Sequence, residues 1–306
     1  EAFRKQIYHI IWHQMIQQRC AGIVEPLHLA CPIASMLFAP SVEACMDVHE
    51  RDAGIPGTID VSHMEIVGKA TVVDSLAAIK HLIFDTKKLT WDQLLDAMEK
   101  NWEGAEAVRQ LCLNAPKYGN GIEWVDAIGW EMENAFCEYA DRNPKPDGQR
   151  WALGQVPITV HVVAGKVVSA TPNGRRAQDF LSEGASASHG ADIKGPTVLF
   201  NSVARARAGN WGGLNGAALM NVKFTPATVA GPQGTQSLMQ IIRTWCSLKL
   251  WHVQFNILNK ATLVEAQKNP EKYRNLIVRV AGYSAYFVEL SPSLQAEIIA
   301  RTEEQM

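Results

Sequence analysis

The sequence has 306 residues, of which 47% are hydrophobic and 20% are charged. These are the values of a folded globular protein, not of a disordered chain or a collagen-like repeat. The 29 basic and 31 acidic residues nearly cancel, which argues against nucleic acid or an anionic membrane surface as the main partner. No apolar run approaches the roughly 20 residues that a membrane span needs. Six scattered cysteines without a C-x-x-C pair are typical of a reducing compartment, so we expect a cytoplasmic protein.

The first part of the chain is predicted to begin with a helix. Apolar residues at helical spacing predict this helix over residues 1–24. His9 and His13 stand four apart on it, which is metal-ligand spacing, but no third ligand is near and we interpret both as part of the helix face. The apolar run within 26–47 is bounded by prolines and predicts a buried strand that leads to a helix at 41–48.

Residues 50–70 are expected to form a loop, and helices return after it. They are predicted over 72–84, 90–102 and 126–141. Thr90 is expected to be the N-cap of the second helix. The segment 143–148 contains two prolines and a glycine, which predicts a break in the chain. The β-branched residues of 155–165 then predict a strand.

Glycine and short polar residues crowd the chain after residue 170. No segment there has the spacing of a phosphate-binding loop, so irregular loops are expected. Further along, the apolar pattern predicts strands at 251–258, 276–280 and 285–290, with a turn at 281–284 between the last two. A helix over 261–269 is expected to end at Pro270. The final helix should begin with Ser291 as its cap and Pro292 in its first position.

Gly282 lies between the last two predicted strands and marks a tight turn that needs a free φ angle. The surrounding sequence RVAGYSAYF (279–287), followed closely by LQAEIIARTE, resembles the signature of the glycyl radical enzyme family. Segments upstream resemble the same family in the same order: DSLAAIKHLIF (74–84), LNAPKYGN (113–120), ATPNGR (170–175), GPT (195–197), HVQFN (252–256) and AQKNPEKYRNLIVRV (266–280). The resemblance covers about residues 26–306.

This resemblance implies an α/β fold, the C-terminal portion of the family's ten-stranded α/β barrel, with the glycine loop inserted in the barrel. Residues 1–169 would form a half-barrel region resembling the pyruvate-formate-lyase-like domain, and residues 170–306 the glycyl radical domain. Gly282 would store a carbon radical whose spin is shared with the adjacent amide nitrogen and carbonyl, because only glycine allows a planar centre on this backbone path. Its loop should be buried, away from oxygen and water. The supporting residues would be Arg279, Val280, Ala281, Tyr283 and Ser284.

Family members pass the radical to a cysteine, which in the lyase and dehydratase branches lies in a G-C-x-E pattern. None of the cysteines here is in that pattern: Cys20, Cys31, Cys45, Cys112, Cys137 and Cys246. Cys137 precedes Glu138, but it lies in an amphipathic helical stretch and is interpreted as a structural residue. We therefore expect a split enzyme in which a partner chain carries the thiyl cysteine. The alternatives are a fragment of a longer chain, and a spare-part or docking module for another glycyl radical enzyme.

The resemblance also implies that an activating enzyme with an iron–sulfur cluster and S-adenosylmethionine installs the radical. This chain has no clustered cysteines to hold such a cluster, and no bound cofactor or metal is expected. The motifs look closer to the eliminase, decarboxylase and hydrocarbon-adding branches than to pyruvate formate-lyase. We expect a lyase-type, oxygen-sensitive enzyme for a small organic substrate, with a bacterial microcompartment as the alternative location. His28, Ile33 and His63 are candidate substrate contacts, although each histidine is also explained as structural.

Overall fold

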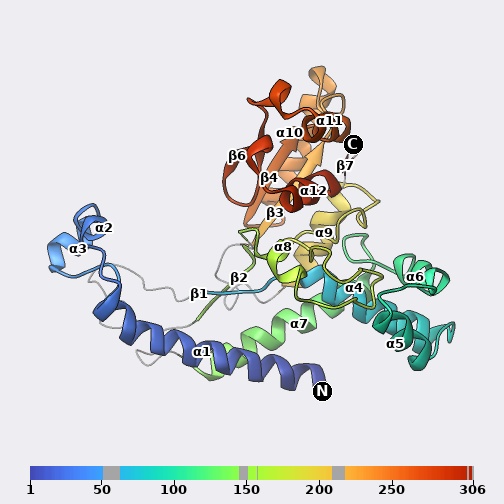
Figure 1. Cartoon of the computed structure of the whole chain (residues 1–306), viewed down its shortest axis with the longest axis horizontal. Coiled ribbons are helices and arrows are strands. Elements are labelled where there is room, and N and C mark those ends of the chain that lie inside the picture. The colour runs from blue at the N-terminus through green and yellow to red at the C-terminus, as the bar shows by residue number, and fades with distance from the viewer. Residues whose placement is uncertain (51–62, 145–150, 157, 209–217, 302, 305–306) are drawn as a thin grey trace. The chain divides into compact units, whose positions relative to one another are not determined.

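The computed structural model describes the chain except for residues 51–62, 145–150, 157, 209–217, 302 and 305–306, and it describes His63 without its side chain. The described residues form two compact units that are interleaved in sequence. The first takes in residues 1–64 and 132–154, and the second takes in 65–131, 155–209 and 217–306. Helices make up most of the regular structure, and short strands lie between groups of them along the chain (Figure 1). The domain division at residues 169 and 170 remains a prediction.

The first unit begins with the long helix α1 (Ala2–His28), which confirms the predicted helix and extends it by four residues. On its exposed face, His9 Nε2 and His13 Nε2 lie 3.1 Å apart. The buried strand expected within 26–47 is wrong, because α2 (Pro32–Met36) and α3 (Ala39–Ala44) occupy that run. Each short helix has a proline in its first two positions, where the fixed φ favours helix formation and no N–H is lost.

Three more elements lie wholly or partly in this unit. Helix α7 (Glu123–Arg142) confirms the helix predicted over 126–141 and extends it at both ends. The short strands β1 (His63–Glu65) and β2 (Ala152–Gly154) pair with each other. Most of the expected loop at 50–70 and of the break at 143–148 lies outside the described residues.

A helical subdomain opens the second unit. It comprises α4 (Lys69–Ile79), the π-helical turn η1 (Lys80–Asp85), α5 (Trp91–Glu99) and α6 (Glu106–Leu113). Thr90 caps α5 as predicted, and Gln93 completes a reciprocal capping box. Trp102 is fully buried in the cluster that these helices share, and its Nε1 donates to the Arg175 carbonyl at 2.9 Å. The helices are thereby tied to the ATPNGR turn.

A three-stranded parallel sheet forms the centre of the second unit, in the order β4–β3–β7. Its strands are β3 (Leu219–Phe224), β4 (His252–Ile257) and β7 (Glu303–Glu304). Strand β4 confirms the strand predicted at 251–258. Helix α9 (Pro196–Arg207) precedes β3, and α10 (Gly231–Ser247) makes the crossover from β3 to β4 that a parallel pair requires (Figure 1). Neither helix was predicted.

The strand predicted at 155–165 is wrong. Gln155 makes a single parallel bridge to Ala218, and Val160–Gly165 forms the short helix α8. Proline at 157 supplies no N–H for the hydrogen bonds of a sheet. The strand preference of β-branched residues depends on their packing and can be overridden by it. Val162 packs into a hydrophobic cluster with Leu263 and Ile298, so tertiary contacts decide the local structure.

The C-terminal elements follow the predicted order. They are α11 (Lys260–Lys268), the 3-10 turn η2 (Pro270–Tyr273), β5 (Ile277–Arg279), β6 (Ser284–Tyr286), the 3-10 turn η3 (Phe287–Glu289) and α12 (Pro292–Ala300). Ser291 caps α12 as predicted. The strand expected over 285–290 is shorter, because the chain turns so that Phe287 is buried, and Gln295 Nε2 donates to its carbonyl at 3.0 Å. Among the described residues, no helix is both long and apolar enough to span a bilayer.

Gly184 lies in the loop before α9, and its backbone packs closely on β3 of this sheet. Its φ is +49°, and a Cβ there would lie far inside van der Waals contact of the Leu219 carbonyl oxygen. Gly104 also has a positive φ, of +69°, but open space around it. We expect Gly104→Ala to lower the free energy of unfolding by about 1–2 kcal/mol, the cost of the left-handed conformation. Gly184→Ala should cost clearly more, because the backbone of β3 must also shift. Urea unfolding measures both, and equal losses would contradict the close approach.

Candidate active site

The turn between β5 and β6 carries Gly282 at its tip. The two strands are antiparallel, with Arg279 opposite Ser284, and Val280 N–H donates to the Tyr283 carbonyl at 2.9 Å. Gly282 has a φ of +87°, and a Cβ added there would meet nothing within 4 Å. The turn therefore requires glycine for its backbone conformation and not for lack of space.

Burial changes abruptly along this turn. Val280 and Ala281 are buried, whereas Gly282, Tyr283 and Ser284 are exposed. The loop was predicted to be buried. In the part of the chain that the structure describes, this holds for residues 280 and 281 but not for the tip at residue 282. Any shielding of the Gly282 Cα from water and oxygen has to come from groups outside the described residues.

Two asparagines on the parallel sheet bind the backbone that leads into the turn. Asn256 on β4 pairs with Arg279 in both directions, since its Nδ2 donates to the carbonyl at 3.0 Å and its Oδ1 accepts the N–H at 2.9 Å. Asn221 on β3 donates through Nδ2 to the Val280 carbonyl at 3.0 Å. Both amides use main-chain groups of the loop, so they fix the path of its backbone.

The end of α12 holds the same two carbonyls from another side. Arg301 donates through Nη1 to the Arg279 carbonyl at 3.1 Å and through Nη2 to the Val280 carbonyl at 3.0 Å. It also makes two 3.0 Å bonds, through Nε and Nη2, to the carboxylate of Glu297. Such two-point pairing fixes the guanidinium plane, and with it the direction of the bonds to the loop.

Two histidines complete the surroundings of Glu297. His189 Nε2 lies 2.7 Å from Glu297 Oε1, and His161 Nε2 lies 3.4 Å from the same oxygen. Burial alone would raise the pKa of Glu297, but the charge of Arg301 and the nearby side chains of His161 and His189 hold that pKa well below its usual range. Glu297 is therefore an anion that balances Arg301 behind the loop.

A second buried carboxyl group, Glu183, lies in the same cluster. Asn221 Nδ2, which binds the Val280 carbonyl, also makes a short hydrogen bond to Glu183 Oε1. Burial raises the pKa of Glu183 to about 7, and the negative charge of Glu297 adds to the rise, while Arg301 opposes it. Glu297 is thus held ionised, whereas Glu183 titrates near neutral pH.

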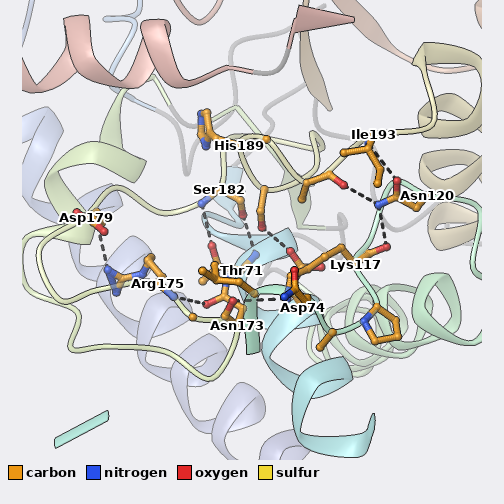
Figure 2. Close-up of a pocket in the computed structure, with 18 of the residues that line it drawn as sticks. Thr71, Asp74, Lys117, Asn120, Asn173, Arg175, Asp179, Ser182, His189 and Ile193 are labelled. Carbon is orange, nitrogen blue, oxygen red and sulfur yellow. Dashed lines mark hydrogen bonds between the residues drawn. The ribbon is translucent and has the colours of Figure 1, made fainter. Parts of the chain in front are cut away.

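A hollow of about 710 Å³ lies beside this cluster, with His189 on its wall (Figure 2). Burial raises the pKa of Asp74 in this hollow to about 6, against the charge of Lys117 and the bonds from Ser188 and the Tyr118 N–H. Asn120 holds the segment after His189 by bonding the Ala191 carbonyl and the Ile193 N–H. These bonds fix the loop that presents His189 to Glu297.

The sequence-predicted residues divide into two groups. Arg279 and Ser284 meet across the hairpin through a 3.0 Å bond from Nη1 to Oγ. The candidate substrate contacts belong to the first unit, where His28 ends α1, Ile33 is 75% exposed on α2, and the His63 side chain lies outside the described residues. Their role remains a prediction. Cys137 is buried on α7.

The polar residues behind the loop were not predicted from the sequence: Glu183, Asn221, Asn256, Glu297 and Arg301. Two signals were present. Polar residues alternate within the apolar strand HVQFN, and Glu297 and Arg301 have the i,i+4 spacing of a helical ion pair. Neither signal predicts which groups these side chains bind, because the residues of the glycine loop become their neighbours only in the folded chain.

Glu183 gives the fold a pH dependence. A carboxyl group whose pKa is raised in the folded state stabilises below its unfolded pKa, and the effect is lost as pH rises through the folded value. We expect the free energy of unfolding to fall between pH 5 and pH 8 by up to about 3 kcal/mol from this group, at about 1.4 kcal/mol per pKa unit. Glu183→Gln should flatten this slope, whereas Glu103→Gln on the surface should not. Urea unfolding at both pH values measures it, and identical slopes in the wild type and Glu183→Gln would contradict the assignment.

Comparison with known proteins places this geometry in a family. Residues 1–165 match the family model described as pyruvate formate lyase-like, and residues 181–288 match the glycine radical model. The chain is 48% identical over 303 residues to the isethionate sulfite-lyase of Oleidesulfovibrio alaskensis, covering 99% of this chain and 36% of the relative. It is 37% identical to the trans-4-hydroxy-L-proline dehydratase of Clostridioides difficile, covering 99% of this chain and 38% of the relative.

A solved structure agrees with these relatives. The B12-independent glycerol dehydratase from Clostridium butyricum is similar with a TM-score of 0.89 and 35% identity, covering 100% of this chain and 38% of that one. The chain thus spans little more than a third of the length of its relatives, and the fold is confirmed as α/β, part of the barrel that these enzymes share. From the two family models and the structural match, the chain belongs to the glycyl radical enzyme family.

Proposed function

We propose that Gly282 stores a carbon-centred radical and that this chain is the radical-bearing part of a lyase that acts on a small 1,2-substituted substrate. The observation that carries the proposal is the turn itself. Its glycine has a positive φ and no side chain within reach of a Cβ, while the carbonyls of Arg279 and Val280, just before it, are held by the side chains of three residues: Asn221, Asn256 and Arg301. Such an arrangement fixes a backbone carbon in place and leaves that carbon accessible.

The chemistry is a hydrogen-atom relay. The activated Gly282 Cα takes the hydrogen atom from a cysteine S–H, which restores the glycine and leaves a thiyl radical. The thiyl radical then takes a hydrogen atom from a substrate carbon, the substrate radical loses its leaving group, and the hydrogen atom returns from the cysteine to the product radical. The thiyl radical left on the cysteine then takes the hydrogen atom back from Gly282, which regenerates the glycyl radical. The protein therefore undergoes no net oxidation.

An elimination is favoured by the relatives. The names of the similar proteins denote a sulfite-lyase and dehydratases, which remove sulfite or water. We infer an elimination of the same kind here, with His28, Ile33 and His63 remaining candidate contacts for the substrate. We infer that the thiyl cysteine is on a partner chain. A separate activating enzyme with S-adenosylmethionine and an iron–sulfur cluster installs the radical, and the reaction takes place in an anaerobic cytoplasm.

Gly282→Ala tests the storage role. The variant loses the α-hydrogen pair and the planarity that the radical needs, so we expect no radical signal and no turnover. The fold should persist with a loss of about 1–2 kcal/mol from the positive φ, because a Cβ there meets no neighbour. Gly104→Ala carries a similar backbone cost away from the turn and should keep both the signal and turnover. Electron paramagnetic resonance and activity after anaerobic activation measure this, and an active Gly282→Ala enzyme would overturn the radical assignment.

The partner is tested by the mass of the native complex purified without oxygen. We expect a second polypeptide that carries a cysteine loop and lacks a glycine loop of its own. A single longer chain containing both loops would refute the two-component arrangement while leaving the role of Gly282 untouched. A partner with its own glycine loop would instead show a spare-part module.

A further inference from the structure

The HVQFN strand also contains Gln254, two residues before Asn256. It lies on β4, is 3% exposed, and stands in register with Asn221 on β3. Side chains two residues apart share one face of a strand, so Gln254 and Asn256 both face the glycine turn. Asn256 serves residue 279, which leaves the role of Gln254 to be explained.

Only one orientation of the Gln254 amide satisfies its neighbours. With the oxygen toward the turn, it accepts the Gly282 N–H at 2.7 Å and Arg279 Nη2 at 3.2 Å, while its nitrogen donates to Asn221 Oδ1 at 3.2 Å. The opposite orientation sets oxygen against oxygen and nitrogen against nitrogen. Because the two amide ends differ only in hydrogen bonding, the surrounding donors and acceptors decide the orientation.

The resulting chain of hydrogen bonds connects the tip of the turn to the buried carboxyl group. Gln254 binds Gly282 and Asn221, and Asn221 in turn binds the Val280 carbonyl and Glu183. Asn256 and Arg301 hold the carbonyls of residues 279 and 280. Within the described part of the chain, the contact that reaches residue 282 itself is the one to Gln254.

We propose that Gln254 is a positioning residue that fixes the plane of the Gly282 amide and strengthens electron donation from its nitrogen to the Cα. An acceptor on an amide N–H polarises the group, and successive bonds in a network reinforce one another. The inference rests on the proposed radical role of Gly282, because the amide nitrogen is one of the two groups that would share its spin. Gln254 does not touch the reacting carbon; it acts through the Gly282 peptide.

Amide hydrogen exchange of the purified chain tests the bond without any radical. Gln254→Met keeps the length of the side chain but removes the acceptor, and we expect the Gly282 N–H to exchange about three- to tenfold faster, as the loss of one net hydrogen bond predicts. Gln254→Glu keeps an acceptor beside Arg279 and should keep the protection. Gln110→Met, on the exposed surface of α6, is the matched control and should change nothing at Gly282.

A wild-type measurement guards against a variant that fails to fold. A scalar coupling across the hydrogen bond, from the Gly282 amide nitrogen to the Gln254 side-chain carbonyl carbon, should be detectable by NMR. Absence of this coupling, or unchanged exchange in a folded Gln254→Met variant, would overturn the proposal.

The electronic part is read from the radical in the activated protein. With 15N-labelled glycine, we expect Gln254→Met to show a smaller nitrogen hyperfine splitting and a lower radical yield than the wild type and Gln254→Glu. An identical signal in all three would refute the electronic role. A wild type that never forms a radical, but shows the protected Gly282 N–H, would overturn the proposed function while the positioning by Gln254 stands.

Discussion

The carbonyl oxygens of Arg279 and Val280 are the points on which the arrangement of the site depends. A short turn with a positive φ at its tip gives its own backbone few internal bonds, and a buried carbonyl without a partner is costly. Here the partners come from β3, β4 and α12 in the form of Asn221, Asn256 and Arg301. The sheet and the last helix thus bind the main chain of the turn. These contacts do not depend on which side chains the turn carries.

Burying a charged cluster behind the turn costs free energy of desolvation, and this cost indicates that the cluster serves a purpose other than stability. Removing charged groups from water costs several kcal/mol per ion, and ion pairing often does no more than offset that cost. Arg301 and Glu297 offset it by bidentate geometry and by the histidines at Glu297. A hydrophobic cluster would stabilise the fold as well but could not hold two carbonyls in a set direction. The polar cluster therefore fits a role in positioning better than one in stability.

Local signals in the sequence predict most of the elements whose ends are marked by caps and turns. Thr90, Ser291 and the turn at Gly282 lie where the pattern places them. The β-branched run at 155–165 misleads, since α8 forms there through its packing on residues far along the chain. The buried pair Glu183 and Glu297 could not be predicted to meet, because 114 positions separate them in the sequence and only the packing of the loop before α9 against α12 brings them together.

The position at which oxygen cuts the chain tests most directly whether the Cα of Gly282 carries the radical. A backbone carbon radical reacts with oxygen and breaks its own peptide chain, so the position of the break reports the position of the radical. Mass spectrometry of the activated protein after exposure to air should find a new C-terminal fragment that begins at residue 283. Only intact chain after a radical has been demonstrated, or a break elsewhere, would contradict the account.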